Sequence, residues 1–165
     1  MLKEMKLSGL VMDPVTNTPI IILKDLDDKN ALPIWIGLLE ASAIAVEMEK
    51  IHVPRPMTHD LVTNILDRLG AEVSRVEVID LKDNTFYALI HLTMKGKTFK
   101  VDSRPSDAIA VALRTKTPIY VDEKVIEESK KMDLDSIKNA DKESGTADLK
   151  DLLENMSPDD FKYKM

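Results

Sequence analysis

The segment 102–107 places two carboxylates, an arginine and two hydroxyls immediately before an apolar run. Asp102 and Asp107 flank Arg104, with Ser103 and Ser106 between them. An arginine can grip a phosphate through paired N–H groups, and neighbouring carboxylate oxygens can hold a divalent cation. The same side chains could instead form a salt-bridged clamp at the start of a helix, because buried charges must be paired. Spacing alone leaves both interpretations open.

A second polar group consists of Arg55, His59 and Asp60, beside two prolines. Thr58 is expected to cap a helix here, which would place His59 and Asp60 in its first turn, where backbone N–H groups attract anions. A carboxylate in that turn also stabilises the helix by itself, so capping is the simpler interpretation. Glu40 begins another expected helix and is a further acid if that helix faces the same cleft.

No catalytic role is expected for the remaining histidines. His52 is expected to be an exposed loop residue, and His91 to take part in a cross-strand pair at the surface. Familiar catalytic motifs are missing from the sequence. It contains no phosphate-binding loop, no dinucleotide-binding glycine motif, no serine-hydrolase elbow and no HExxH zinc pair. Without these motifs, the sequence gives no support for a phosphate-loop nucleotide-binding protein, a serine hydrolase or a zinc metalloprotease.

The composition of the chain further narrows the class of protein. With 165 residues, 44% hydrophobic and 32% charged, the chain predicts one globular domain. It has no cysteine, which excludes disulfides, iron–sulfur clusters and a thiol nucleophile. No apolar run reaches the roughly 20 residues of a membrane-spanning helix, and the N-terminus does not resemble a signal peptide. We therefore expect a cytoplasmic protein without a membrane partner.

The net charge of −6 is unevenly distributed. Residues 1–121 hold 15 Lys+Arg against 16 Asp+Glu, whereas residues 122–165 hold 8 against 13. A nearly neutral body argues against a broad nucleic-acid-binding face, which needs clustered cations. It still permits a small cleft with two or three arginines.

Hydrophobic periodicity predicts an α+β fold in which blocks of antiparallel or mixed sheet pack with several helices. The first three strands are expected to form a meander, and the third helix, apolar on almost every side, is expected to be buried. Residues 1–132 form the predicted domain; 133–165 are a predicted polar linker and a short amphipathic helical tail, which must dock on its own core or a neighbouring subunit. The expected strands are 5–11, 19–23, 32–36, 72–81, 85–94, 98–102 and 118–121, and the helices 40–51, 58–69, 103–114 and 123–132.

Four strings in order resemble the bifunctional nuclease family of bacteria and plants. They are LPIWIGLLEASAIA (32–45), RPMTHDL (55–61), LKDNTFYA (81–88) and DSRPSDAIAVALR (102–114). The resemblance implies a compact α+β domain, a homo-oligomer, and nuclease activity on both DNA and RNA. The family positions present here are Glu40, Arg55, His59, Asp60, Asp102, Arg104, Ser106 and Asp107.

A phosphodiester hydrolase must activate water and stabilise a pentacoordinate anion. In our hypothesis Asp102 and Asp107 bind Mg²⁺ or Mn²⁺, and His59 is the general base or acid. Further acids come from Glu40 and Asp60, and the phosphate is held by Arg55, Arg104 and Ser106. The alternatives are a non-catalytic oligomeric module that binds a small anion or a partner protein, and a purely structural motif. Convergence on an open cleft would favour chemistry, and mutual burial would favour structure.

Overall fold

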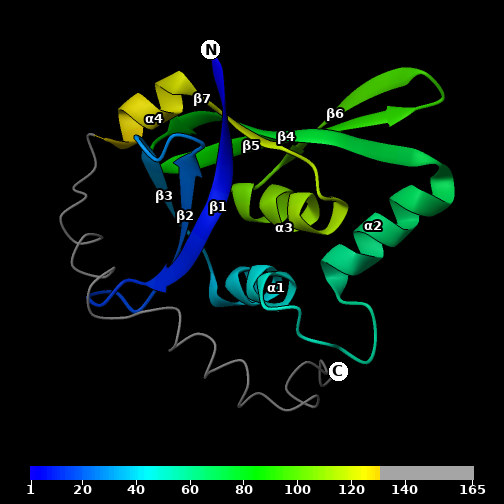
Figure 1. The fold of residues 1–165 in the computed structure, drawn as a ribbon, viewed down its shortest axis with the longest axis horizontal. Helices are drawn as coiled ribbons and strands as arrows, with labels where there is room; N and C mark the ends of the chain where they lie inside the picture. Colours follow the sequence, from blue (N-terminus) through cyan, green and yellow to red (C-terminus); the bar gives the residue numbers. More distant parts are fainter. Residues whose placement is uncertain (131–165) are drawn as a thin grey trace.

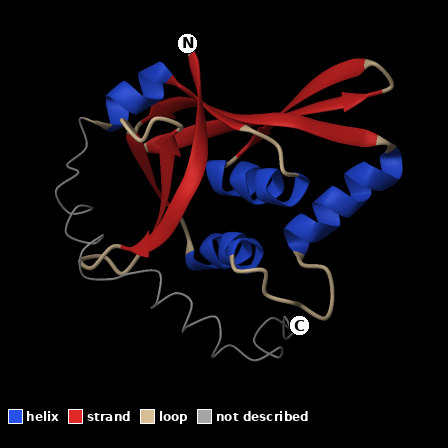
Figure 2. Cartoon of the chain, viewed as in Figure 1, coloured by secondary structure: helices blue, strands red, loops and turns tan. Residues whose placement is uncertain are grey.

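The computed structural model describes residues 1–130, so the predicted linker and tail (133–165) lie outside the described residues. The predicted α+β class is confirmed: one mixed seven-stranded sheet packs with four helices (Figures 1 and 2). The sheet order is β3-β2-β1-β7-β4-β5-β6. In chain order the elements are β1 (Leu2–Met12), β2 (Pro19–Asp25), β3 (Ala31–Trp35), α1 (Leu38–Met48), α2 (Thr58–Leu69), β4 (Ala71–Lys82), β5 (Thr85–Met94), β6 (Lys97–Ser103), α3 (Pro105–Thr115), β7 (Ile119–Asp122) and α4 (Glu123–Ser129).

The sheet consists of two antiparallel meanders joined by one short strand. Strands β1, β2 and β3 form the first meander, as predicted, and β4, β5 and β6 form the second. Strand β7 pairs antiparallel with β1 and parallel with β4, so it connects the two halves. The β-branched run Ile20–Ile22 is buried in the first half, where such side chains pack well on a pleated surface.

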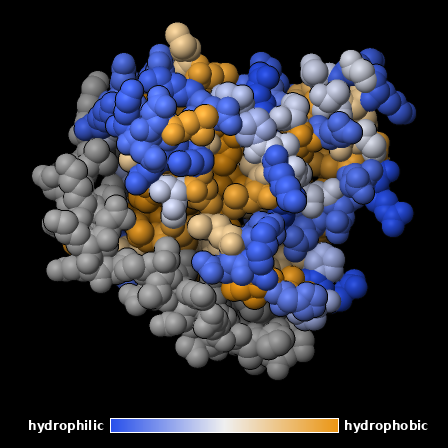
Figure 3. Space-filling model, viewed as in Figure 1, coloured by the Kyte–Doolittle hydropathy of each residue, from blue (hydrophilic) through white to orange (hydrophobic). Residues whose placement is uncertain are grey.

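Helix α3 is central, as its apolar composition predicts. It lies between the sheet and α1 in Figure 1, and all side chains from Ala108 to Ala112 are buried. The alanines of α1 and α3 allow the two helices to pack closely. Apolar residues gather over the middle of the face seen in Figure 3, around β1, α1 and α3. Among the described helices, none has the length and apolar character that a membrane crossing requires.

Several local details differ from the sequence predictions, among them the start of α3, which is Pro105 rather than residue 103. Helix α1 begins at Leu38, two residues before the predicted start at Glu40. The N-cap of α2 is Met57 rather than Thr58. His91 is buried, not at the surface, because β5 lies between β4 and β6 and its Nε2 is 3.0 Å from the Glu77 carboxylate. The predicted stop of α2 at Gly70 is confirmed; this residue adopts the left-handed conformation, with φ 69°.

Candidate functional site

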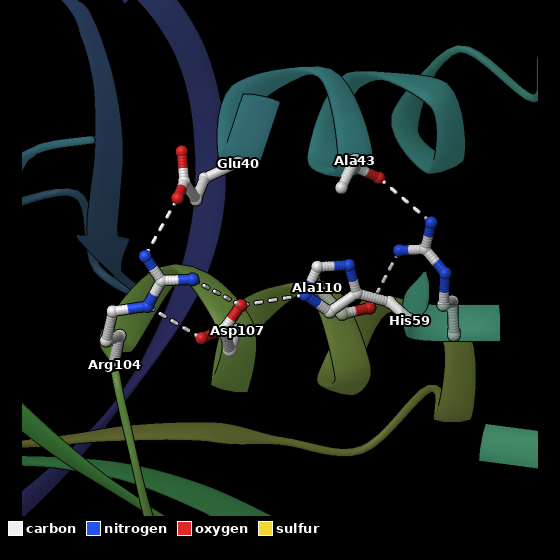
Figure 4. A network of polar contacts seen from close by, with 7 residues as sticks. Glu40, Ala43, His59, Arg104, Asp107 and Ala110 are labelled. Carbon is white, nitrogen blue, oxygen red and sulfur yellow. Dashed lines mark hydrogen bonds and ion pairs between the residues drawn. The ribbon is translucent and has the colours of Figure 1, made fainter. Parts of the chain in front are cut away.

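Four predicted site residues, carried by three helices, come together in a polar cluster. Glu40 lies in the first turn of α1, His59 in that of α2, and Arg104 and Asp107 at the start of α3. Figure 4 shows Asp107 between Arg104 and His59, with Glu40 reaching toward Arg104 from above. Three helix N-termini therefore face one another, and we call Glu40, His59, Arg104 and Asp107 the polar cluster.

Asp107 is the centre of this cluster. Its Oδ1 is 2.9 Å from His59 Nε2, and its Oδ2 accepts a 2.9 Å hydrogen bond from Arg104 Nε. Burial opposes ionisation of the carboxyl, but the hydrogen bonds from Arg104 and His59 outweigh it and lower the Asp107 pKa below its ordinary value. An ionised carboxylate only accepts hydrogen bonds, so His59 Nε2 is the donor of this contact and Nδ1 is the ring nitrogen that Asp107 does not engage.

Arg104 faces solvent while it bridges two acids. Its side chain is 64% exposed, its Nη1 donates to Glu40 Oε1 at 2.8 Å, and its Nη2 donates to Asp107 Oδ1 at 3.3 Å. The hydrogen bonds with Asp107 and Glu40 raise the pKa of this guanidinium, so it stays charged. A guanidinium has five N–H groups, and these contacts leave one on each terminal nitrogen for an anion.

Gly37, at the N-cap of α1, makes room for the Glu40 carboxylate. A β-carbon at this position would overlap Glu40 Oε2. The backbone itself does not require glycine, because φ is −75° and ψ is 161°, which any residue adopts. The glycine therefore serves close approach, and it fixes where Glu40 meets Arg104. Sequence reasoning did not identify this residue as part of the site.

Asp60 belongs to a separate ion pair on the inner side of α2. Its Oδ1 accepts a 2.7 Å hydrogen bond from Arg114 Nε, and its Oδ2 accepts one from the Met57 backbone N–H. Burial opposes ionisation of Asp60, but these contacts outweigh it and lower the Asp60 pKa. Arg114 is 5% exposed and also donates to the carbonyls of Ala43 and Ala110. Asp60 therefore helps to hold α1, α2 and α3 together.

Sequence reasoning also missed Arg114. It closes the DSRPSDAIAVALR string and is the one charged residue after Asp107 in an otherwise apolar stretch. A lone arginine on a helix that must be buried signals a buried partner, because an unpaired charge there is costly. That signal was available, but the sequence could not say which carboxylate pairs with it.

In the described part of the chain, the side chains of the other predicted site residues form no hydrogen bond or ion pair with the polar cluster. Ser106 is buried in the first turn of α3. Arg55 is exposed in the loop before α2, and Asp102 is exposed on β6. Within residues 1–130, neither Arg55 nor Asp102 forms a side-chain hydrogen bond or an ion pair. The structure therefore brings together four of the eight predicted positions and pairs a fifth, Asp60, with Arg114.

A metal held jointly by Asp102 and Asp107 does not fit this arrangement. On β6, Asp102 lies opposite Leu89 of β5. The next residue, Ser103, lies opposite Ala88, which is buried in the core with residues of α3. Successive strand residues face opposite sides, so Asp102 faces away from the cluster. Both oxygens of Asp107 accept hydrogen bonds from Arg104. In the described part of the chain, no group of three His, Asp or Glu side chains could hold a metal ion.

Comparisons with known proteins agree on one family. The family model described as "Bifunctional nuclease domain" matches residues 21–133. An uncharacterized protein of Mycobacterium tuberculosis is 37% identical over 96% of this chain and 98% of its own length. Bifunctional nuclease 1 of Arabidopsis thaliana is 32% identical over 62% of this chain, and Bifunctional nuclease 1 of Oryza sativa subsp. indica is 30% identical over 64%. The match spans 33% of each plant protein.

Proposed function

Because the chain belongs to the bifunctional nuclease domain family, we propose that it hydrolyses phosphodiester bonds in DNA and RNA at the polar cluster. The observation that carries the proposal is the shared carboxylate of Asp107, which binds both His59 and the exposed Arg104. One acid thus orients a base and a phosphate-binding cation in the same place. The names of the plant relatives support a nucleic acid as the substrate class.

In this proposal Arg104 binds the scissile phosphate through its two remaining N–H groups. A water molecule beside the phosphorus gives its proton to His59 Nδ1 as its oxygen attacks. The bond between phosphorus and the leaving oxygen then breaks, and that oxygen takes a proton from solvent. Asp107 keeps His59 in the tautomer with a free Nδ1 and stabilises the imidazolium that forms, as the aspartate of a catalytic triad does.

Glu40 has a positioning role. It contacts Arg104 Nη1 and neutralises part of the guanidinium charge, so it sets the direction of the two free N–H groups. With neutral His59 the cluster carries two acids and one cation. Protonation of His59 therefore brings the cluster to neutrality at the step where the phosphate becomes more negative, which favours the transition state.

A purely structural role is the rival that one observation favours: Arg104 and Asp107 already form an i,i+3 ion pair without any ligand. The two roles differ in what Arg104 contributes to stability. A structural clamp would lose stability when Arg104 is removed. An ion pair with a side chain that is 64% exposed is worth only about 0–1 kcal/mol, so we expect little change in the free energy of unfolding.

The test is cleavage of single-stranded DNA and RNA by the purified chain and by His59→Gln, Arg104→Ala and Asp107→Asn variants. Two of these variants have a matched control at an exposed position: His52→Gln for His59→Gln and Arg68→Ala for Arg104→Ala. We expect the cluster variants to lose at least about 100-fold in rate, the usual contribution of general acid–base catalysis, and the controls to keep full activity. Equal rates in all variants with unchanged circular dichroism would contradict the proposal.

Divalent-metal dependence stays a prediction, and the same assay tests it. Reactions with Mg²⁺, Mn²⁺ or EDTA separate a metal-assisted reaction from one that the cluster performs alone. A phosphate that brings its own cation could approach Arg104 without any protein carboxylate as ligand, since Mg²⁺ often binds through substrate phosphates. Loss of activity in EDTA that is restored by Mg²⁺ would establish the requirement.

A further inference from the structure

Strand β6 is an edge of the sheet that no other element among residues 1–130 pairs with on its outer side. It is the last strand in the order, and within residues 1–130 its only neighbour is β5. Its pairing with β5 runs without a bulge from Met94↔Lys97 to Ala88↔Ser103, so the edge is regular. Natural proteins disrupt or cover such edges, because a free row of backbone N–H and C=O groups pairs readily with another strand.

The side chains of β6 divide into an apolar face and a charged face. Phe99 and Val101 are 42% and 44% exposed, on the side that faces the helices. Lys100 and Asp102 are exposed on the opposite side, two residues apart. Neither Lys100 nor Asp102 has an ion-pair partner among the described residues. On this face of β6, Lys100 and Asp102 are thus one cation and one anion without an ion-pair partner in the described part of the chain.

From these features we propose that two copies of the chain pair through β6 in an antiparallel, twofold-symmetric arrangement centred on Val101. In that register Val101 lies opposite the partner's Val101, and Lys100 lies opposite the partner's Asp102. Symmetry repeats the ion pair, so both charges of both copies are matched. A register centred on Lys100 would instead place two lysines opposite each other, which is unfavourable.

Helix α2 supplies the remaining contact area. A pair of seven-residue strands alone buries less than the roughly 1,600 Å² of a typical stable interface. Phe99 and Val101 pair with Leu92 and Ile90, which pack on the same core as Leu66 of α2, so helix and strand share one side of the sheet. The outer face of α2 is apolar and uncovered in the described structure, through Leu61 (53% exposed), Val62 (37%), Ile65 (49%) and Leu69 (63%).

This inference goes beyond the proposed nuclease function and does not rest on it. Lys100, Val101 and Asp102 lie outside the polar cluster, and the oligomeric state is measured without substrate. Because α2 carries His59 yet buries none of its own residues, the dimer also gives that helix a second support. Failure of the dimer would leave the nuclease assay interpretable, and failure of nuclease activity would leave the dimer intact.

Exchange of the charges at Lys100 and Asp102 tests which residues lie opposite each other when two β6 strands pair. Sedimentation of the full chain at micromolar concentration should give a dimer. Lys100→Asp alone and Asp102→Lys alone should each raise the dimer dissociation constant at least about tenfold, because like charges would then lie opposite each other. The double variant should restore the dimer. An equimolar mixture of the two single variants should form a heterodimer, since each then meets the opposite charge.

A second pair of variants tests the centre of the interface. Val101→Asp should give a monomer, whereas Val15→Asp, at a valine that is 83% exposed in the β1–β2 turn, should leave the dimer unchanged. A wild-type chain that sediments as a monomer would overturn the proposal. So would a dimer that survives Val101→Asp, because another surface would then hold the copies together.

Discussion

The two ends of α3 each carry an arginine, and the two arginines have different roles because they differ in solvent exposure. Arg104 and Arg114 each donate three hydrogen bonds and each reach toward α1. The side chain of Arg104 is 64% exposed and that of Arg114 is 5% exposed. Arg104 can therefore take up a ligand, while Arg114 is committed to the protein itself.

The hydrogen-bond partners of the two arginines differ in the same way. Arg104 binds two carboxylates, which keep it charged and oriented but leave two N–H groups toward solvent. Arg114 binds one carboxylate and two backbone carbonyls, one of them Ala43 on α1. Loss of Arg114 would leave the Asp60 carboxylate without its cation, and removal of one partner from a buried ion pair is costly. The comparison predicts opposite phenotypes for the two arginines.

Arg114→Ala should have the largest effect on stability. It would leave Asp60 without its cation and remove the donor to the Ala43 carbonyl, and loss of one partner from a buried pair costs about 3 kcal/mol. Urea denaturation followed by circular dichroism measures the change. The double variant Arg114→Ala/Asp60→Asn should recover part of the loss. A change below about 1 kcal/mol would show that the pair is not shielded from solvent.

Arg104→Ala should show the reverse behaviour. We expect nuclease activity to fall at least about 100-fold, equivalent to 2.7 kcal/mol of transition-state binding, while the free energy of unfolding changes by about 1 kcal/mol or less. Arg104→Lys keeps the charge but loses the paired N–H geometry, so it should restore little activity. Cleavage rates and denaturation midpoints of the same preparations measure both sides. A large loss of stability would place Arg104 with Arg114 as a structural residue.

Gly37→Ala should have a moderate effect that depends on Glu40. The added methyl group would displace the Glu40 carboxylate from Arg104, and overpacking of this kind costs about 1 kcal/mol. The double variant Gly37→Ala/Glu40→Ala should then be more stable than the sum of the single effects predicts. Denaturation of the four proteins in this cycle gives the coupling. Simple additivity would mean that the methyl group does not act through Glu40.

Acidic pH should weaken the ion pairs that Asp60 and Asp107 form with Arg114 and Arg104, and near neutral pH the effect should be smallest. The pKa values of Asp60 and Asp107 are lowered from the ordinary 3.8, so each contributes stability that is fully present above that pH. This stability is lost as pH falls from 3.8 through the lower folded-state pKa. Asp60→Asn and Asp107→Asn should each give a shallower loss below about pH 4 than wild type. Parallel curves for all three proteins would contradict the assignment.

The fold was largely predictable because its signals are local. Alternating and β-branched residues, the turn at Asp83–Asn84 and the stop at Gly70 all act within a few residues, and the structure confirms them. The burial of α3 was also predictable, since a helix with apolar residues on almost every side has no surface to present to water. Helix starts were less predictable: Thr58 is a favoured capping residue, yet Met57 is the N-cap of α2.

The candidate site was predictable as a set of residues but not as a set of contacts. The sequence could not show that Asp60 turns inward to Arg114 while its neighbour His59 meets Asp107, because that choice depends on how α2 crosses α3. It also could not place Asp102 on the far side of β6, away from Asp107. The burial of His91 required knowledge that β5 is an inner strand.

The position of β7 has a consequence for the order in which the protein assembles. This four-residue strand is the last of the sheet to leave the ribosome, and it is the only connection between the two meanders within the described sheet. Until it is in place, β1 and β4 each present an open side. Long-range pairing of this kind is slow, and unpaired strands are prone to aggregate meanwhile. Synthesis that stalls before Ile119 would therefore leave two half-sheets that cannot merge.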